Sequence, residues 1–588
     1  MNKTKIICTI GPACNTVEKM IELIHAGMSV ARLNFSHGTY EEHLEMIRRL
    51  KEARKRTGKP LSIMLDTKGP EIRLGKIKDG QALLKANQRW IFRRDEIEGD
   101  DQQVTIKPFS VFDNIQVGTR ILFDDGYFSA QVVELGSDAV TIELANGGII
   151  RSGKGVNIPN TSLNLPGITE KDIEDIKFGC EQQIDIIAAS FVRSAENILT
   201  IRNLIATHNQ SDIIIIAKIE NAEGVHNFDS IIQAADGIMI ARGDLGVEVP
   251  LSHVPRLQKM MIRRCYLAGK PVVTATQMLE SMINNPRPTR AETSDVANAI
   301  YDSTSAVMLS GETAIGRYPV ETVNVMREII FEAEADFNYR AFLEQHTKFV
   351  YNDIPSAVTL ASVKTAYSSN AKAIFTFTKG GGTARLLSRL RPRMPIIAMC
   401  STERIFNQLA FLWGVIPIVD EEHVNAEDSF KHLCNYAIEH NLVTYGDLVV
   451  MTVGVPFGVS GTTNTMMVKS VGEVLVRAGM GYGQRVHGEV IIVFTPHSHQ
   501  PEEIFNKILV ISKCDQSYHP LIAQAAGVVL QNHISDFESE KIAKKIATDL
   551  GKPIILRADD ATHNLHDGIE VTLDPVKSLV YRGVVGGS

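Results

Sequence analysis

Short apolar segments alternate with helical periodicity from residue 3 to about residue 335. Apolar runs that end in polar residues are typical of buried strands, and an apolar residue at every third or fourth position is typical of helices. Eight such strands, nearly all followed by a helix, predict a (β/α)8 barrel, whose active site lies at the carboxyl ends of the strands. The predicted strands are KIICTIGPA, SVARLNFSHG, LSIMLDTKGP, IDIIAASFV, DIIIIAKIEN, GIMIARGDLG, PVVTATQML and SAVMLSGETA.

The barrel pattern is interrupted after its third strand, between residues 70 and 165. Here apolar and polar residues alternate with a period of two, and turn signals such as Asp125-Gly126 separate the runs. We predict a small all-β domain that lies over the strand ends as a lid. The barrel resumes with PGITEKDIEDIKFGC, in which Thr169 is a candidate helix N-cap.

Two further α/β regions follow the barrel. The first contains a strand, a glycine loop and a helix with Thr383 and Arg385, an arrangement that holds a phosphate on a helix N-terminus. The second begins near NKILVISKCDQ and runs to the end of the chain. The expected fold class is therefore α/β, with a barrel at 1–69 and 166–345, a lid at 70–165, a second α/β domain at 346–475 and a C-terminal α/β domain at 485–588.

The composition excludes several classes of protein. Of the 588 residues, 44% are hydrophobic and 22% are charged, as in ordinary soluble globular proteins. No segment approaches the ~20 consecutive apolar residues that span a membrane. The net charge of −7 gives no reason to expect a nucleic-acid partner. The seven cysteines are scattered without a C-x-x-C pair, as in the reduced thiols of cytoplasmic proteins.

Polar residues follow the predicted strands at the end where a barrel has its active site. Lys218 and Glu220 are two apart and share a face of their strand, and Arg242 and Asp244 have the same spacing after the next strand. One interpretation is two ion pairs that hold the strand ends together. The other is that the carboxylates bind Mg²⁺ while the cations neutralise a phosphate or an enolate. The whole set is Thr9, Arg32, Asn34, Ser36, Asp66, Lys68, Ser190, Lys218, Glu220, Arg242, Asp244, Thr276, Ser310 and Glu312.

Longer motifs in this region resemble those of the pyruvate kinase family. They are IIIAKIENAEGV, MIARGDLGVEVP, VTATQMLESMINNPRPTRAETSDVANAIYD, AVMLSGETAIGRYP, ARLNFSHG and LDTKGPEIR. The resemblance extends from residue 3 to about 475, with the inserted β domain in the expected place. It implies transfer of the phosphoryl group of phosphoenolpyruvate to ADP, which gives pyruvate and ATP in the final step of glycolysis.

The resemblance implies roles for the residues at the strand ends. Glu220 and Asp244 would hold Mg²⁺ or Mn²⁺. Lys218 and Arg32 would contact the transferring phosphoryl group and offset its charge. The carboxylate of the substrate would bind the backbone amides of Gly243 and Asp244 and the hydroxyl of Thr276.

Once the phosphoryl group has left, enolpyruvate must gain a proton at carbon. The resemblance leaves two candidate routes for this proton. One is the hydroxyl of Thr276, and the other is Ser310 with Glu312 and water.

The resemblance also implies a monovalent cation. Asn34, Ser36, Asp66 and the carbonyl of Thr67 match the K⁺ ligands of the family, all of them hard oxygen donors. Glu71 matches the glutamate of K⁺-dependent members, whereas K⁺-independent members have a lysine there. We therefore predict dependence on K⁺.

The nucleotide would lie between the barrel and the lid. Asn34, His37, Arg73 and Lys154 match positions that contact ADP or ATP in the family. Lys154 stands in GKGVN at the edge of the lid, so closure of the lid would bring it over the phosphates and exclude water.

A phosphorylated metabolite is the expected allosteric effector, and the resemblance implies a homotetramer. The segment GVPFGVSGTTNT contains no lysine or arginine, which favours a monophosphate, such as a sugar phosphate or a nucleoside monophosphate, over a bisphosphate. The expected effector residues form the glycine loop: Thr378, Lys379, Gly380, Gly381, Gly382 and Thr383.

The C-terminal domain resembles the extra domain of some bacterial pyruvate kinases, which is similar to the swivelling phosphohistidine domain of phosphoenolpyruvate-utilising enzymes. The Thr-Ser-His motif of active carriers is missing, because the region around His533 reads LQNHISDFESEKIAKKIA. We expect this domain to act in assembly or regulation. Two alternatives to the whole interpretation are another barrel enzyme of phosphoenolpyruvate and pyruvate, such as a metal-dependent aldolase, and a regulatory homologue that only binds ligands.

Overall fold

The computed structural model of the chain describes residues 2–159, 161, 165–346, 353–420, 425–456, 459 and 461–585. The chain divides into two compact units, residues 1–356 with 377–421 and residues 357–376 with 422–588. Within the described residues, no helix is both long and apolar enough to cross a membrane.

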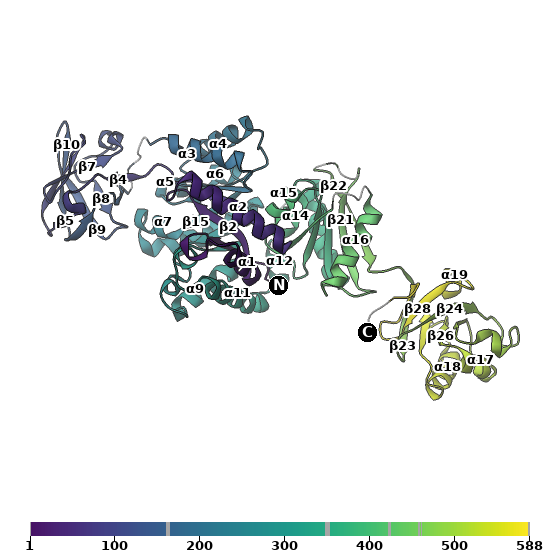
Figure 1. Cartoon of the computed structure of the whole chain (residues 1–588). Helices are drawn as coiled ribbons and strands as arrows, with labels where there is room; N and C mark the ends of the chain where they lie inside the picture. The colour runs from purple at the N-terminus through teal and green to yellow at the C-terminus, as the bar shows by residue number, and fades with distance from the viewer. Residues whose placement is uncertain are drawn as a thin grey trace. The chain divides into compact units, whose positions relative to one another are not determined.

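The first unit contains the predicted barrel. Eight parallel strands close on themselves, and each coincides with one of the eight segments that the hydrophobic pattern predicts, with β2 starting one residue earlier, at Met28. Figure 1 shows strands β2 and β15 enclosed by the surrounding helices. The strands are β1 (Lys5–Thr9), β2 (Met28–Asn34), β3 (Ser62–Asp66), β13 (Ile186–Ala189), β14 (Ile214–Ile219), β15 (Gly237–Ala241), β16 (Val272–Ala275) and β17 (Ala306–Leu309).

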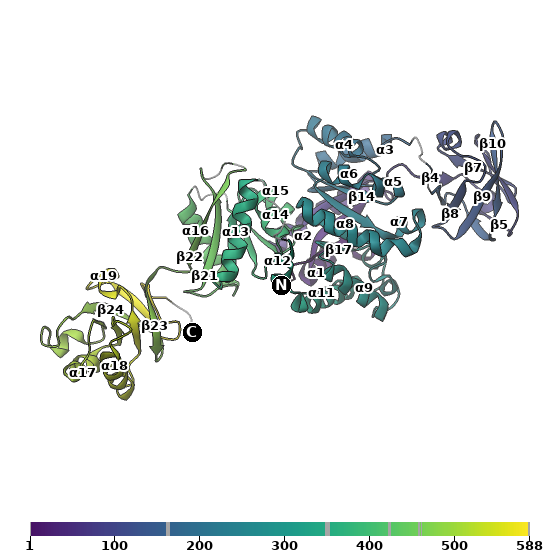
Figure 2. The same cartoon turned by 180° about the vertical axis from the view of Figure 1, so that it is seen from behind.

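Helices surround the barrel and bury their apolar faces on its outer side. Figure 2 shows α8 on this outer side, where it contacts β15 and β16. Thr169 caps α3 as predicted, because its hydroxyl accepts from Asp172 N–H at 3.1 Å. The helices are α1 (Val17–Ala26), α2 (Tyr40–Thr57), α3 (Glu170–Glu181), α4 (Ala195–Thr207), α5 (Ala222–His226), α6 (Phe228–Ala234), α7 (Arg242–Glu248), α8 (Val254–Ala268), α9 (Arg290–Tyr301), α10 (Gly311–Ala314), α11 (Pro319–Asp336) and α12 (Tyr339–His346).

The interruption after β3 folds as an all-β domain, as its period-two pattern predicts. Seven strands form a closed barrel around buried aromatic side chains that include Trp90, Phe92 and Phe123, and two more strands pair beside it. The predicted turn at Asp125-Gly126 connects β8 to β9, with Tyr127 N–H donating to Asp124 O at 3.0 Å. The strands are β4 (Ile72–Leu74), β5 (Gln81–Leu84), β6 (Arg89–Arg93), β7 (Gln103–Lys107), β8 (Arg120–Phe123), β9 (Phe128–Leu135), β10 (Ala139–Leu144), β11 (Gly148–Arg151) and β12 (Gly155–Asn157).

The rest of the first unit follows the barrel in sequence. Parallel strands β19 and β20 pair from Ile396↔Val415 to Cys400↔Val419. The side chain of Phe411 is buried in the core inside the barrel, among residues such as Ile7 and Val30. These elements are α14 (Gly382–Arg389), β19 (Ile396–Cys400), α15 (Glu403–Leu409) and β20 (Val415–Val419).

The second unit contains an α/β segment and a C-terminal domain. In the α/β segment, β18 pairs in parallel with β21, and β21 pairs in antiparallel with β22. Its elements are α13 (Ile354–Ser368), β18 (Ala373–Phe377), α16 (Ala426–Glu439), β21 (Leu448–Gly454) and β22 (Thr463–Ser470).

The C-terminal domain is a closed barrel of seven strands with helices packed on the parallel strands β25 to β27. Its first strand, β23, lies before the predicted start at residue 485 and pairs with β27 and β29. Its elements are β23 (Val474–Tyr482), β24 (Val486–Ile492), β25 (Ile508–Ile511), α17 (His519–Gln524), β26 (Gly527–Leu530), α18 (Phe537–Asp549), β27 (Ile554–Ala558), α19 (Ala561–Asn564), β28 (Glu570–Asp574) and β29 (Leu579–Arg582).

A lysine is buried at the amino end of the barrel, opposite the predicted active site. Lys5 is 6% exposed, and its Nζ donates to Val415 O at 2.9 Å. Burial lowers the pKa of Lys5 from 10.5 to about 8, although the charge of Glu334 opposes the effect. The folded chain therefore binds this proton less tightly than the unfolded chain.

We expect Lys5→Met to remove a pH-dependent part of the stability. Between about pH 8 and about pH 10.5 the unfolded chain keeps the proton that folded Lys5 loses, so the wild-type chain gains stability as pH rises. The difference in Tm between the wild type and Lys5→Met should therefore increase from about pH 8 to about pH 10.5. The corresponding gain in the free energy of unfolding of the wild type is at most about 3 kcal/mol. Lys59→Met, at an exposed lysine, is the control. A difference that stays constant for Lys5→Met would contradict the expectation.

Candidate active site

Three charged side chains from three strands meet at the carboxyl end of the barrel. Asp66, at the end of β3, is fully buried. Its Oδ2 accepts from Arg32 Nε of β2 at 2.5 Å, and its Oδ1 accepts from Lys218 Nζ of β14 at 2.9 Å. Parallel pairing of β2 with β3 and of β13 with β3 and β14 brings these strand ends together. One carboxylate thus bridges two cations.

The predicted partnership of Lys218 and Glu220 is present. Lys218 Nζ lies 3.0 Å from Glu220 Oε1 and also donates to Ser190 Oγ at 2.6 Å. The other oxygen of Glu220 accepts from Phe191 N–H at 2.5 Å. Both side chains are almost completely buried, with Lys218 7% and Glu220 2% exposed.

The expectation that Arg242 and Asp244 form a second pair at a strand end is wrong. Strand β15 ends at Ala241, and Arg242 already begins α7, where residues two apart do not share a face. Arg242 turns away from the mouth, donating to Ala275 O and Thr276 O at 3.2 and 2.9 Å and pairing with Asp295. Asp244 is therefore left without this cation.

Charge and burial shift the pKa values at the mouth in opposite directions. Burial alone would lower the pKa of Lys218, but the charges of Asp66 and Glu220 outweigh it, so the pKa is raised. Burial alone would raise the pKa of Asp66, but Arg32 and Lys218 hold it below its usual value. Lys218 and Asp66 are therefore charged at neutral pH.

The two remaining carboxyls behave differently. Burial raises the pKa of Glu220 to about 7, with Lys218 opposing and Asp244 adding to the effect. Burial also raises the pKa of Asp244. The charge of Lys218 opposes this effect, whereas the charges of Asp125 and Glu71 add to it. Each of two neighbouring carboxylates makes ionisation of the other less favourable, and a divalent cation bound between them would stabilise both negative charges. In the described part of the chain no cluster of three or more His, Cys, Asp or Glu residues could hold a metal, so this pair would need ligands from substrate and water.

The residues predicted to bind the substrate carboxylate lie next to each other. Gly243 N–H donates to Thr276 Oγ1 at 2.8 Å, and this hydroxyl donates to Ala275 O at 2.6 Å. Thr276 has a left-handed backbone, with φ of 68°, which is uncommon for a β-branched residue. Strain at this position holds the hydroxyl beside the amide.

Glu312 links two strand ends instead of facing the mouth alone. Its Oε2 accepts from Ser310 N–H at 2.7 Å, and its Oε1 accepts from Leu279 N–H at 3.2 Å. Burial raises the pKa of Glu312, although these backbone hydrogen bonds oppose the effect. This carboxyl positions the loops after β16 and β17.

The four predicted K⁺ ligands lie on neighbouring strand ends. Asn34 is paired with Asp66 in the register of β2 and β3, and Asn34 Oδ1 accepts from Ser36 N–H at 3.2 Å. Thr67 O accepts from Ser190 Oγ at 2.6 Å. The carbonyl, amide and carboxylate oxygens of an alkali-ion site are thus present on adjacent residues.

A cavity of about 770 Å³ lies between the lid and the barrel mouth, and it brings together several predicted nucleotide contacts. It is lined by His37, Arg73 and Lys154, together with Glu71 and Asp244. Arg73 Nε pairs with Glu71 Oε2 at 2.6 Å, and Lys154 Nζ pairs with Asp124 Oδ1 at 2.6 Å. Both cations are partly exposed, so they can exchange these partners for a phosphate.

The predicted effector loop starts α14, but its residues are not all accessible. Gly381 has φ of 80° at the helix N-cap, and Thr378 N–H donates to Met399 O at 2.9 Å. Lys379, Gly380 and Gly382 are exposed, whereas Thr383 is 9% exposed. Residues 457, 458 and 460 of GVPFGVSGTTNT lie outside the described residues.

Sequence reasoning missed the position of Phe191 and gave Ser190 no role. Ser190 orients Lys218 and the Thr67 carbonyl, while Phe191 has φ of 53° and directs its N–H at Glu220. The only signal was the polar serine that ends an apolar strand, because left-handed backbone at phenylalanine has no sequence signature. Strand β16 is followed by an irregular loop and a short 3₁₀ turn (Glu280–Ile283), and Met278 and Met282 of this segment are buried.

Known proteins share this architecture and sequence. Residues 1–323 match the family described as pyruvate kinase, barrel domain, and residues 356–469 match pyruvate kinase, alpha/beta domain. The pyruvate kinases of Geobacillus stearothermophilus and Bacillus licheniformis are 45% and 42% identical over 585 and 586 residues, which is 99% of each chain. A crystal structure of a pyruvate kinase from Cryptosporidium parvum has a TM-score of 0.77 and 41% identity, and the match covers 80% of this chain and 96% of that one. The chain therefore belongs to the pyruvate kinase family, enzymes of the phosphotransferase class EC 2.7.1.40.

Proposed function

We propose that the barrel mouth transfers the phosphoryl group of phosphoenolpyruvate to ADP and releases pyruvate and ATP. The observation that carries the proposal is the buried bridge of Asp66 between Arg32 and Lys218, beside the carboxyls of Glu220 and Asp244. Cations fixed at the end of a closed barrel offset the charge of a phosphoryl group without rearrangement during the reaction. A regulatory homologue would not need this set.

The donor chemistry supports two metal ions. Glu220 and Asp244 would hold Mg²⁺ or Mn²⁺, since burial, together with neighbouring carboxylates, raises the pKa values of both carboxyls, and a divalent cation would stabilise their charged forms. When bound, the divalent ion supplies positive charge to the phosphoryl and carboxylate oxygens of the substrate. Asn34, Ser36, Asp66 and the Thr67 carbonyl would hold K⁺.

The chain's own residues perform the remaining tasks. Arg32 and Lys218 orient the phosphoryl group, while Arg73 and Lys154 hold the phosphates of ADP. An oxygen of the β-phosphate of ADP forms a bond to phosphorus as the bond from phosphorus to the enol oxygen breaks. Lys218 then stabilises the negative oxygen of enolpyruvate.

Enolpyruvate finally takes one proton at carbon. Thr276 is one proposed donor, because its hydroxyl lies beside the Gly243 amide that would hold the substrate carboxylate. Ser310 with Glu312 and water is the other. Glu312 holds this loop in place by accepting hydrogen bonds from Ser310 N–H and Leu279 N–H.

The proposal extends to organisation and regulation. The proposed domains are the barrel at 1–69 and 166–345, the lid at 70–165, an effector domain that follows residue 345, and a C-terminal domain that starts with β23 at Val474. A sugar phosphate or a nucleoside monophosphate would bind at residues 378–383 and regulate a cytoplasmic, glycolytic homotetramer. The C-terminal domain would serve assembly or regulation, since the Thr-Ser-His motif of active carriers is missing and the ring of the exposed His533 bonds Ser535 Oγ at 2.6 Å.

We expect Lys218→Met to abolish turnover while the chain stays folded. Loss of the buried cation removes charge stabilisation from the phosphoryl group and the enolate, which is worth about 10²–10³ in kcat. Pyruvate formation from phosphoenolpyruvate and ADP with Mg²⁺ and K⁺ is the measurement. Lys177→Met, at an exposed lysine of α3, is the matched control and should keep full activity. Wild-type protein without turnover, or a Lys218→Met protein as active as wild type, would refute the proposal.

We expect K⁺ to stimulate the wild-type enzyme and Glu71→Lys to reduce this stimulation. An ammonium at position 71 would supply positive charge beside the substrate in place of the alkali ion. The ratio of kcat/KM in K⁺ to that in tetramethylammonium should fall by about tenfold, equivalent to about 1.4 kcal/mol. Glu71→Gln, which removes charge without adding a cation, should keep the dependence. An unchanged ratio in Glu71→Lys would refute the assignment of Glu71.

A further inference from the structure

Two segments of the chain connect the barrel to the lid. The outgoing segment leaves β3 at Asp66 and passes through Gly69 to the start of β4 at Ile72. The returning segment, residues 165–169, leads into α3. The position of the lid relative to the barrel mouth therefore depends on how these two segments are held.

One buried carboxylate bonds to both segments. Asp172, in the first turn of α3, is 1% exposed. Its Oδ1 accepts from Gly69 N–H of the outgoing segment at 2.9 Å. Its Oδ2 accepts from Thr169 N–H at 2.8 Å and from Thr169 Oγ1 at 2.7 Å, in the returning segment. The bonds to Thr169 belong to the capping box of α3, but capping alone does not require the bond to Gly69.

The outgoing segment also packs against residues that hold the charges of the active site. Gly69 has φ of 72°, and a Cβ on it would lie 2.8 Å from Phe191 Cδ2 and 3.0 Å from Ser190 Cβ. Phe191 N–H donates to Glu220, and Ser190 Oγ accepts from Lys218. Both the left-handed backbone and the close approach require glycine at this position. The outgoing segment is therefore fixed relative to the barrel mouth.

A second side chain holds the returning segment. Arg193, in the loop between β13 and α4, donates from Nη2 to Leu165 O at 2.6 Å and to Pro166 O at 2.8 Å. Gly167 lies against Asn197 of α4, whose side-chain amide would overlap a Cβ at this glycine. Both connections to the lid are therefore held by the residues that follow β13.

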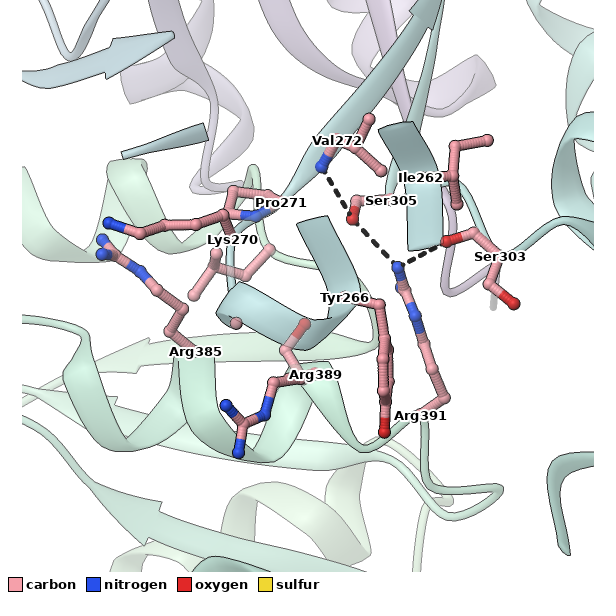
Figure 3. Close-up of a pocket in the computed structure, with 13 residues that line it drawn as sticks. Ile262, Tyr266, Lys270, Pro271, Val272, Ser303, Ser305, Arg385, Arg389 and Arg391 are labelled. Carbon is pink, nitrogen blue, oxygen red and sulfur yellow. Dashed lines mark hydrogen bonds between the residues drawn. The ribbon is translucent and has the colours of Figure 1, made fainter. Parts of the chain in front are cut away.

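The opposite end of the barrel has a comparable bond that does not involve the lid. Figure 3 shows Arg391 donating to Ser303 O and Ser305 Oγ, both at 2.9 Å. Ser305 Oγ also accepts from Val272 N–H at 3.1 Å, so these bonds join the starts of β16 and β17. Arg391 thus fixes a junction within the barrel, whereas Asp172 fixes the connections to an inserted domain.

We propose that Asp172 is a positioning residue that sets the lid over the barrel mouth and thereby determines how tightly ADP binds. This inference rests on the proposed function, in which Arg73 and Lys154 of the lid hold the phosphates of ADP. Asp172 is not among the described residues that line the cavity, so it acts through the two connections. The residues proposed to bind phosphoenolpyruvate belong to the barrel, so the affinity for this substrate does not depend on the position of the lid.

The test compares Asp172→Asn with Asp536→Asn in the full chain. An amide has one acceptor oxygen, so the side chain at position 172 can then serve one connection but not both. Asp536 Oδ1 accepts from Ser539 N–H at 3.1 Å at the start of α18, so Asp536→Asn weakens a helix cap outside the barrel. Both variants should lose a few degrees of Tm.

The two variants should differ in nucleotide binding. Asp172→Asn should raise the Kd of ADP with Mg²⁺, measured by calorimetry, and the KM of ADP by about tenfold, because a bond to a buried carboxylate is lost. Its Kd of phosphoenolpyruvate and its kcat should stay within twofold of wild type. Asp536→Asn should leave all four quantities unchanged. Equal ADP affinity in wild type and Asp172→Asn, or an equal loss of affinity for both substrates, would overturn the proposal.

Hydrogen exchange separates this inference from the proposed function. Peptides that cover residues 67–72 and 165–171 should together exchange faster in Asp172→Asn than in wild type. Exchange and binding require no turnover, so a wild type that forms no pyruvate is detected separately. Should Asp172→Asn fail to fold, Thr169→Val replaces it, because it removes one bond to Oδ2 and should raise the Kd of ADP in the same direction. Unchanged exchange in both peptides would also overturn the proposal.

Discussion

The carboxylate of Asp66 is the interaction on which the active site depends. It is fully buried and accepts hydrogen bonds from Arg32 and Lys218, which arrive from two other strands. Without this carboxylate, the buried charges of Arg32 and Lys218 would repel each other and would lack a partner of opposite charge. The barrel makes the arrangement possible, because three parallel strands end at the same level and point these side chains inward.

This carboxylate also fixes the electrostatics around it. Because Asp66 is one anion shared by two cations, the three side chains together carry one excess positive charge. This charge stabilises the carboxylate of Glu220, which lies 3.0 Å from Lys218 Nζ. Asp244 has no such partner, since Arg242 bonds to the loop after β16 and to Asp295. The mouth therefore combines fixed cations for a phosphate with two carboxyls suited to a divalent ion, and one of these carboxyls, Asp244, lines the cavity beneath the lid.

Sequence patterns could predict the framework and part of the site. Alternating apolar runs predict all eight barrel strands, and the spacing of Lys218 and Glu220 correctly predicts that they meet. The direction of Arg242 could not be predicted, because β15 ends at Ala241 and α7 begins at Arg242, before the two charged residues that the pattern assigned to the strand end. The bridge at Asp66 could not be predicted, because it depends on the register of strands that are far apart in sequence. Arg32 is 34 positions from Asp66, and Lys218 is 152 positions from it.

The most direct test of the account is the rate of a single turnover of phosphoenolpyruvate with ADP by Asp66→Asn, measured beside its thermal unfolding. An amide cannot neutralise two buried cations, so both should shift from the positions that hold the phosphoryl group. The account predicts a folded protein whose rate falls by about 10³, equivalent to about 4 kcal/mol. A folded Asp66→Asn protein that turns over within a few-fold of wild type would contradict the claim that this bridge organises the site.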